Sequence, residues 1–193
     1  MIGPYLSPET RQMPDHDLLT RHTKAWLARV IIGHGLCPFA KSEFDKGSIH
    51  YAVIDAPDQG QQLEQVMAQC RALDEDAEKE TSLLIFPQGL SEFHDFVELL
   101  RRANALLKRE GYEGVYQFAS FHPDYCFGDA SAEDPANYTN RSPYPMLHIL
   151  REAGVEAALE GFASPENIPS RNIQLTQELG LAAMQDLLAD CYK

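Results

Sequence analysis

Apolar residues at helical spacing define the first element of the chain. Leu19 and Trp26 are seven residues apart, and the apolar positions that follow them continue the same face. We predict a helix over residues 15–32, in which Asp15 or Asp17 accepts the hydrogen bonds that begin it.

The middle of the chain alternates between short strands and long amphipathic helices. We predict strands at 49–54, 82–87 and 115–121, separated by helices at 59–74 and 91–110. The second strand is apolar throughout, as expected for a strand covered on both faces. This alternation predicts the α/β class, with a small, mainly parallel sheet of about three strands covered by helices.

The last third of the chain begins with a long irregular segment, residues 122–145, which is rich in polar and aromatic side chains. Loops of that length are usually functional when they are not disordered. Two helices, at 142–160 and 170–191, are expected to complete the order α-β-α-β-α-β-α-α. We expect residues 1–193 to form a single domain, with residues 1–14 as an N-terminal tail.

Composition excludes several classes of partner. The chain has 29 acidic and 16 basic residues, a formal net charge of −13, so we expect neither nucleic acid nor an anionic membrane to bind it. Its four cysteines are widely spaced and no secretion signal is recognisable at the N-terminus, a pattern typical of a reduced cytoplasmic protein. No motif assigns a cofactor or an oligomeric state.

Cys37 is the first candidate for chemistry. Gly33-His34-Gly35 is expected to end the first helix, and Pro38 suits the first position of a new short one. Cys37 would then cap that helix, where the helix dipole stabilises a thiolate and lowers the pKa of the thiol. The alternative is a small buried side chain, which is common for a free cysteine.

Two histidines could supply acid–base chemistry. His122 follows the third predicted strand, at the end of a parallel strand where ligands commonly bind. A hydrogen bond from His122 to a backbone carbonyl is the structural alternative. His148 lies in the helix predicted over 142–160, on one face with Tyr144 and Glu152.

The segment before His148 could hold an anion. Ser142 at a helix start, together with the planar guanidinium of Arg141, suits a carboxylate or phosphate. Asn137, Tyr138 and Asn140 would orient the bound molecule. Alternatively, these residues only support the loop.

The motifs resemble those of the DUF1415 family, bacterial proteins without an assigned function. The resemblance rests on Leu36-Cys37-Pro38-Phe39-Ala40, on Phe121-His122-Pro123 and on residues 137–148, and it extends to Gly180. It implies no activity, but Arg171 or Asn172, in a further matching segment, could join the site. Cys-Pro-Phe-Ala is also similar to the active site of single-cysteine thioredoxin-fold proteins.

Three hypotheses follow from these residues. The first is a thiol-dependent enzyme acting on a small anionic molecule, with Cys37 as thiolate and His122 or His148 as acid and base. The second is a zinc or iron protein that uses Cys37, His122 and His148 as ligands. The third is a non-catalytic binding or adaptor module. These residues do not decide whether the protein is an enzyme.

Overall fold

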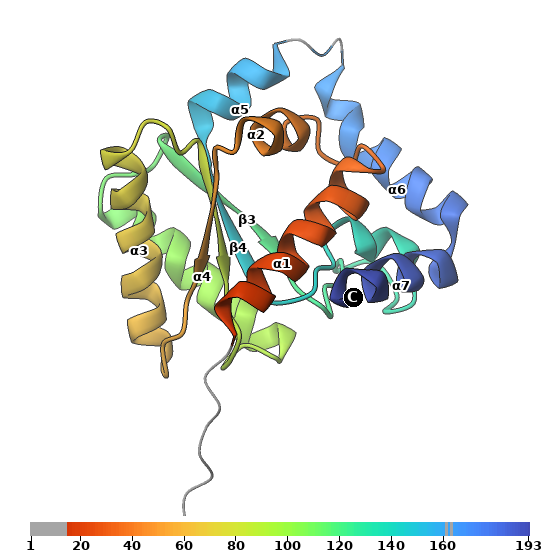
Figure 1. The fold of residues 1–193 in the computed structure, drawn as a ribbon, viewed down its shortest axis with the longest axis horizontal. Coiled ribbons are helices and arrows are strands. Elements are labelled where there is room, and N and C mark those ends of the chain that lie inside the picture. Colours follow the sequence, from red (N-terminus) through yellow and green to blue (C-terminus); the bar gives the residue numbers. More distant parts are fainter. Residues whose placement is uncertain (1–14, 161, 163) are drawn as a thin grey trace, which may run out of the picture.

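A four-stranded mixed sheet organises the computed structural model, which describes residues 15–160, 162 and 164–193 (Figure 1). The strands are β1 (Ile49–Val53), β2 (Thr81–Ile85), β3 (Tyr116–Phe121) and β4 (Met146–Arg151), in the order β1-β2-β4-β3. The predicted α/β class is confirmed. The predicted tail, residues 1–14, lies outside the described residues.

The sheet differs from the predicted one because β4 is inserted in its centre. β1 and β2 pair in parallel, whereas β4 pairs antiparallel with both β2 and β3. Residues 146–151 were predicted to be helical, and only the following residues form a helix, α5 (Glu152–Leu159). The prediction of a mainly parallel three-stranded sheet was therefore wrong in strand number and direction.

Two helices cover one face of the sheet. These are α3 (Gln59–Glu75) and α4 (Phe93–Arg109), close to the predicted bounds, and Figure 1 shows them together on one side. A buried cluster joins them to the strands, including Leu84 of β2 and both Leu147 and Ile149 of β4. Residues at alternate positions of β4 therefore face this side, as the period of a strand requires.

The opposite face is covered by the two ends of the chain. The first helix, α1 (His16–Trp26), begins at the predicted Asp15 cap, whose side chain accepts from the Leu18 N–H at 3.0 Å. It continues as a π-helical segment, Leu27–Ile32. The predicted 170–191 helix is instead two helices, α6 (Ile168–Leu179) and α7 (Leu181–Ala189), divided at Gly180.

The turn after the first helix leads into α2 (Ala40–Lys46), which begins two residues later than predicted. Two glycines make this turn possible. Gly35 has a positive φ of 62°, and a side chain on Gly33 would meet the carbonyl of Arg29 in the π-helical segment. The turn places Cys37 just before the N-terminal end of α2.

Candidate functional site

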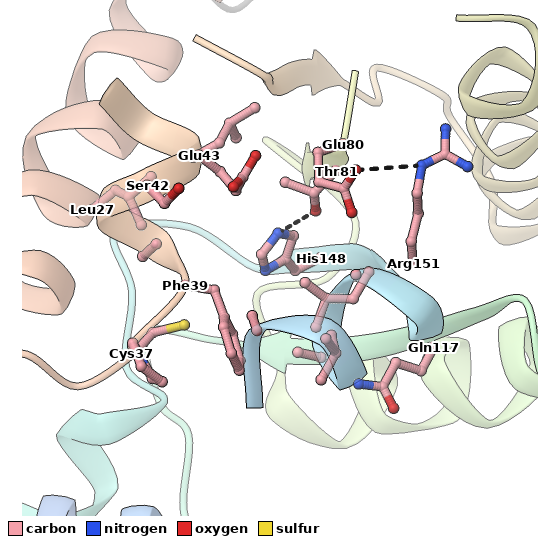
Figure 2. Close-up of a pocket in the computed structure, with 18 of the residues that line it drawn as sticks. Leu27, Cys37, Phe39, Ser42, Glu43, Glu80, Thr81, Gln117, His148 and Arg151 are labelled. Carbon is pink, nitrogen blue, oxygen red and sulfur yellow. Dashed lines mark hydrogen bonds and ion pairs between the residues drawn. The ribbon is translucent and has the colours of Figure 1, made fainter. Parts of the chain in front are cut away.

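The larger cavity lies on the face of the sheet opposite α3 and α4. It has a volume of about 590 Å³ and is enclosed by the sheet, by α2 and by one face of α5. Its polar residues include Thr81, Gln117, His148 and Cys37 (Figure 2). The other side chains are largely apolar and include Leu27, Phe39, Ile49, Ala119, Leu150, Val155 and Ala158.

A smaller cavity of about 340 Å³ lies on the other side of Cys37. It is enclosed by the turn after the first helix, by the start of α6 and by the irregular segment that follows β3. Cys37 and Phe121 line both cavities. The turn and the irregular segment, far apart in sequence, therefore meet at Cys37.

His148 lies on the floor of the larger cavity because β4 is a strand. Its neighbours Leu147 and Ile149 point to the α3 and α4 side, which turns His148 to the opposite face. The predicted helical face shared by His148, Tyr144 and Glu152 does not exist.

The hydrogen bonds of Thr81 determine which nitrogen of His148 carries the proton. The hydroxyl of Thr81 donates its one hydrogen to the carbonyl of Ile149, at 2.5 Å. Its contact with Nε2 of His148, also 2.5 Å, must therefore be a bond that the imidazole N–H donates. The Nδ1 nitrogen then carries a lone pair, and Figure 2 shows it directed toward Phe39.

The imidazole of His148 is held in its neutral form. Burial lowers its pKa to about 4, because the cavity lining offers the charged form little solvation. No described residue forms a hydrogen bond with Nδ1 of His148. The floor of the cavity therefore presents one hydrogen-bond acceptor without a partner.

Cys37 lies in the wall between the two cavities and is a thiol. The backbone N–H groups of Phe39 and Ala40 lower its pKa, but burial has the larger effect and raises the pKa overall. The predicted lowering of the Cys37 pKa was wrong, because desolvation outweighs the amide groups of this short helix. In Figure 2 the Phe39 side chain lies between Cys37 and His148.

His122 is located on the other face of the sheet. Its ring packs against Phe93 and Phe96 of α4, with ring centroids 5.2 and 5.3 Å away. Nε2 donates to the carbonyl of Leu90 at 2.9 Å, and Nδ1 accepts from the N–H of Asp124 at 3.0 Å. His122 lines neither cavity, so it does not join Cys37 and His148 in one site.

The remaining predicted residues mostly hold the irregular segment in shape. The amide of Asn137 is buried and bonds to the backbone of Phe127 and Ser131. Arg141 donates to the carbonyls of Tyr125 and Ala132 and lies over the ring of the buried Tyr138.

Ser142 caps no helix, contrary to the prediction. Its hydroxyl donates to the carbonyl of Tyr144 at 2.6 Å, four residues before β4 begins. Asn140, in contrast, lines the smaller cavity together with Cys37 and Asn172. Arg171 donates to the carbonyl of Gly35 and so supports the turn that carries Cys37.

Two ion pairs also line the larger cavity. Lys46 bonds to Glu43 at 2.8 Å, and Arg151 lies 4.0 Å from Glu80. Arg151 also donates to the hydroxyl of Tyr116 and to two backbone carbonyls. The cationic groups of this cavity are therefore already engaged by protein atoms.

Sequence reasoning missed the residues that complete this site. Thr81 lies just before the predicted strand, and Gln117 was assigned to a strand without a role. Val155 and Ala158 look like ordinary helix residues. The one available signal was the alternation around His148, where apolar residues on both sides fit the period of a strand.

Within the described residues, no helix is long and apolar enough to cross a membrane. In the same part of the chain, no three His, Cys, Asp or Glu side chains are arranged to hold a metal ion.

The fold and the cavities define an α/β protein with space for a small molecule between its sheet and two helices. The chain belongs to the DUF1415 family, described as a protein of unknown function, and matches it over residues 18–186. Comparison with curated proteins and with solved structures gives no match, so the likeness to thioredoxin-fold proteins stays a prediction.

Proposed function

We propose that the protein binds a small, uncharged, mainly apolar molecule in the larger cavity, through a hydrogen bond to Nδ1 of His148. The observation that carries this proposal is the unpaired lone pair of a neutral imidazole on the floor of a cavity of about 590 Å³. Ligand sites are typically of this size, largely apolar, with a few polar groups that fix orientation. The bound molecule would donate from a hydroxyl or an N–H group.

The charges around the cavity favour an uncharged ligand over the anion expected from the sequence. Lys46 is paired with Glu43, and Arg151 lies near Glu80 and bonds to Tyr116. An anion would have to compete with these partners for either cation, and would also lose its own hydration.

The protonation states favour binding over catalysis. A base with a pKa of about 4 accepts a hydrogen bond but has little tendency to take a proton near pH 7. The raised pKa of Cys37 keeps it as a thiol, which is the poorly nucleophilic form. Both groups are therefore neutral, which is compatible with a neutral ligand.

Phenol and toluene test the hydrogen bond, because they differ in a hydroxyl and a methyl group on the same ring. Burial of the methyl group of toluene is itself worth roughly 0.8 kcal/mol, so the hydrogen bond is measured as a change in the ratio of phenol to toluene affinity. We expect this ratio to be roughly fivefold higher in the unaltered protein than in His148→Phe, which corresponds to a net hydrogen bond of about 1 kcal/mol. Titrations followed by NMR would measure both affinities, and the ¹⁵N shift of Nδ1 would report the bond directly.

A ratio of phenol to toluene affinity that is the same in the unaltered protein and in His148→Phe would contradict the proposal. Thermal unfolding of the variant, compared with the unaltered protein, establishes that it is folded. Thr81→Val provides a second variant, since it removes the hydroxyl that holds the imidazole without adding a ring.

A thiol-dependent enzyme is the second candidate, and one observation favours it: Cys37 and His148 line the same cavity. Alkylation with N-ethylmaleimide distinguishes the two candidates. With the Cys37→Ser background subtracted, binding without catalysis predicts a rate that is still rising steeply with pH at pH 9, because the rate follows the thiolate fraction and burial raises the pKa of Cys37. A rate that has already levelled off at pH 7 would support the enzyme.

A further inference from the structure

The two cavities share lining residues. Cys37 and Phe121 line both, and each side chain is half-buried. Phe121 packs edge-on against Trp26, with 5.0 Å between ring centroids, on the side of the sheet that carries both cavities. The side chains of Cys37 and Phe121 therefore form part of the division between the cavities. Such side chains can change rotamer at modest cost.

The smaller cavity has few polar groups available for a ligand. Asn140 donates to the carbonyl of Ser120 at 3.1 Å and accepts from Thr139 at 3.0 Å. Asn172 donates to the carbonyl of Leu36 at 2.6 Å. The remaining lining is hydrocarbon or aromatic, from Ile31, Phe127, Ile168, Pro169 and Ile173.

The two cavities therefore differ in chemistry. The larger one holds the unpaired acceptor of His148, and the smaller one, of about 340 Å³, suits an apolar group. An apolar group that leaves water for such a surface gains roughly 0.8 kcal/mol per methylene, which is about fourfold in affinity. A polar group would gain no partner there.

We propose that the two cavities form one site for an elongated, amphipathic molecule. Its hydroxyl or N–H head bonds to His148, and its hydrocarbon tail passes between Cys37 and Phe121 into the smaller cavity. This inference rests on the proposed function, and it adds the substrate class: a neutral head with a linear tail.

Linear alcohols test both parts of the inference. We expect binding of 1-butanol, 1-hexanol, 1-octanol and 1-decanol, measured by displacement of phenol, to tighten by about fourfold per methylene. Ile173→Trp places a larger side chain in the smaller cavity. It should lower the ratio of 1-decanol to 1-butanol affinity by at least tenfold.

Val97→Trp is the matched control, because Val97 is an exposed residue of α4, on the opposite face of the sheet. Its affinity ratio should equal that of the unaltered protein. Ile173 is itself partly exposed, at 37%, so tryptophan can be accommodated there without unfolding α6. Far-ultraviolet circular dichroism checks the fold of both variants.

Protection of Cys37 provides a measurement that needs no variant of the smaller cavity. At pH 9.5, saturating 1-decanol should slow the alkylation of Cys37 by N-ethylmaleimide at least tenfold more than saturating 1-butanol does. A tail that passes the thiol should cover it, whereas a butyl chain, the shortest of the series, should cover it least.

The outcomes separate the two proposals. If the ratio of phenol to toluene affinity falls in His148→Phe but alcohol affinity stops rising with length, or Ile173→Trp leaves the ratio of 1-decanol to 1-butanol affinity unchanged, the elongated ligand is wrong and the proposed function stands. If neither phenol nor any alcohol binds, both are wrong. Equal protection of Cys37 by the two alcohols would also overturn the inference.

Discussion

The environment of individual residues decides which of the candidates are available to a ligand. His122 and Arg141 have side chains that could bind a ligand, but both side chains already form hydrogen bonds with the backbone. His148 keeps one nitrogen that no described residue bonds, and Cys37 keeps its proton. The site is identified by polar groups that are free to bind a ligand, more than by residue type.

Acid should destabilise the protein through His148. In the unfolded chain a histidine has a pKa near 6.5, whereas in the fold the pKa of His148 is about 4. As the pH falls from 6.5 to 4, the unfolded state binds a proton that the folded state does not. The free energy of unfolding then falls by up to about 1.4 kcal/mol per pH unit.

Urea denaturation at pH 7.0, 5.5 and 4.5 would measure this loss, with His148→Gln as the comparison. Because glutamine does not titrate, the variant should lose less stability on acidification. The difference in free energy of unfolding between the two proteins should therefore narrow. Parallel losses in both proteins would show that His148 does not carry the effect.

At the scale of elements, the turn after the first helix and the strand β4 position the site. The turn carries Cys37 to the wall between the cavities, and β4 carries His148 to the floor. The turn was predicted from its glycines, because the conformation of Gly35 is a local property. β4 was not, because its pairing with β2 and β3 joins residues at least 25 positions apart.

Gly35→Ala should destabilise the protein by about 1–2 kcal/mol, because a side chain strains a backbone with a φ of 62°. Gly128→Ala is the matched control, since Gly128 has no positive φ and its added carbon meets no atom within 4 Å. Chemical denaturation midpoints would compare the two. An equal, small effect of both substitutions would show that Gly35 is not strained by a side chain.

The whole molecule has a well-packed side and a less packed side. On one side of the sheet, α3 contributes five buried residues to a continuous core with α4 and the strands. On the other, α5 has no buried residue and covers a cavity with Val155 and Ala158. Local opening is least costly where few buried contacts must break.

Native-state hydrogen exchange should therefore show that the amides of α5 open at a lower free energy than those of α3. Saturating phenol should slow the exchange of α5 more than that of α3, because the ligand would lie beneath α5. Exchange of α5 and α3 in one cooperative step, or equal protection of both by phenol, would contradict this expectation.

The sequence by itself determined the α/β class, the helices α3 and α4, a cap at Asp15 or Asp17 and the glycine turn, because each depends on local periodicity or local backbone preference. It also indicated Cys37 and His148 as residues of interest. Only the tertiary structure decided that His148 lies on a central strand and that His122 faces the other side of the sheet. Strand insertion, burial and hydrogen-bond partners depend on contacts between distant segments, and these contacts set the protonation states of the site.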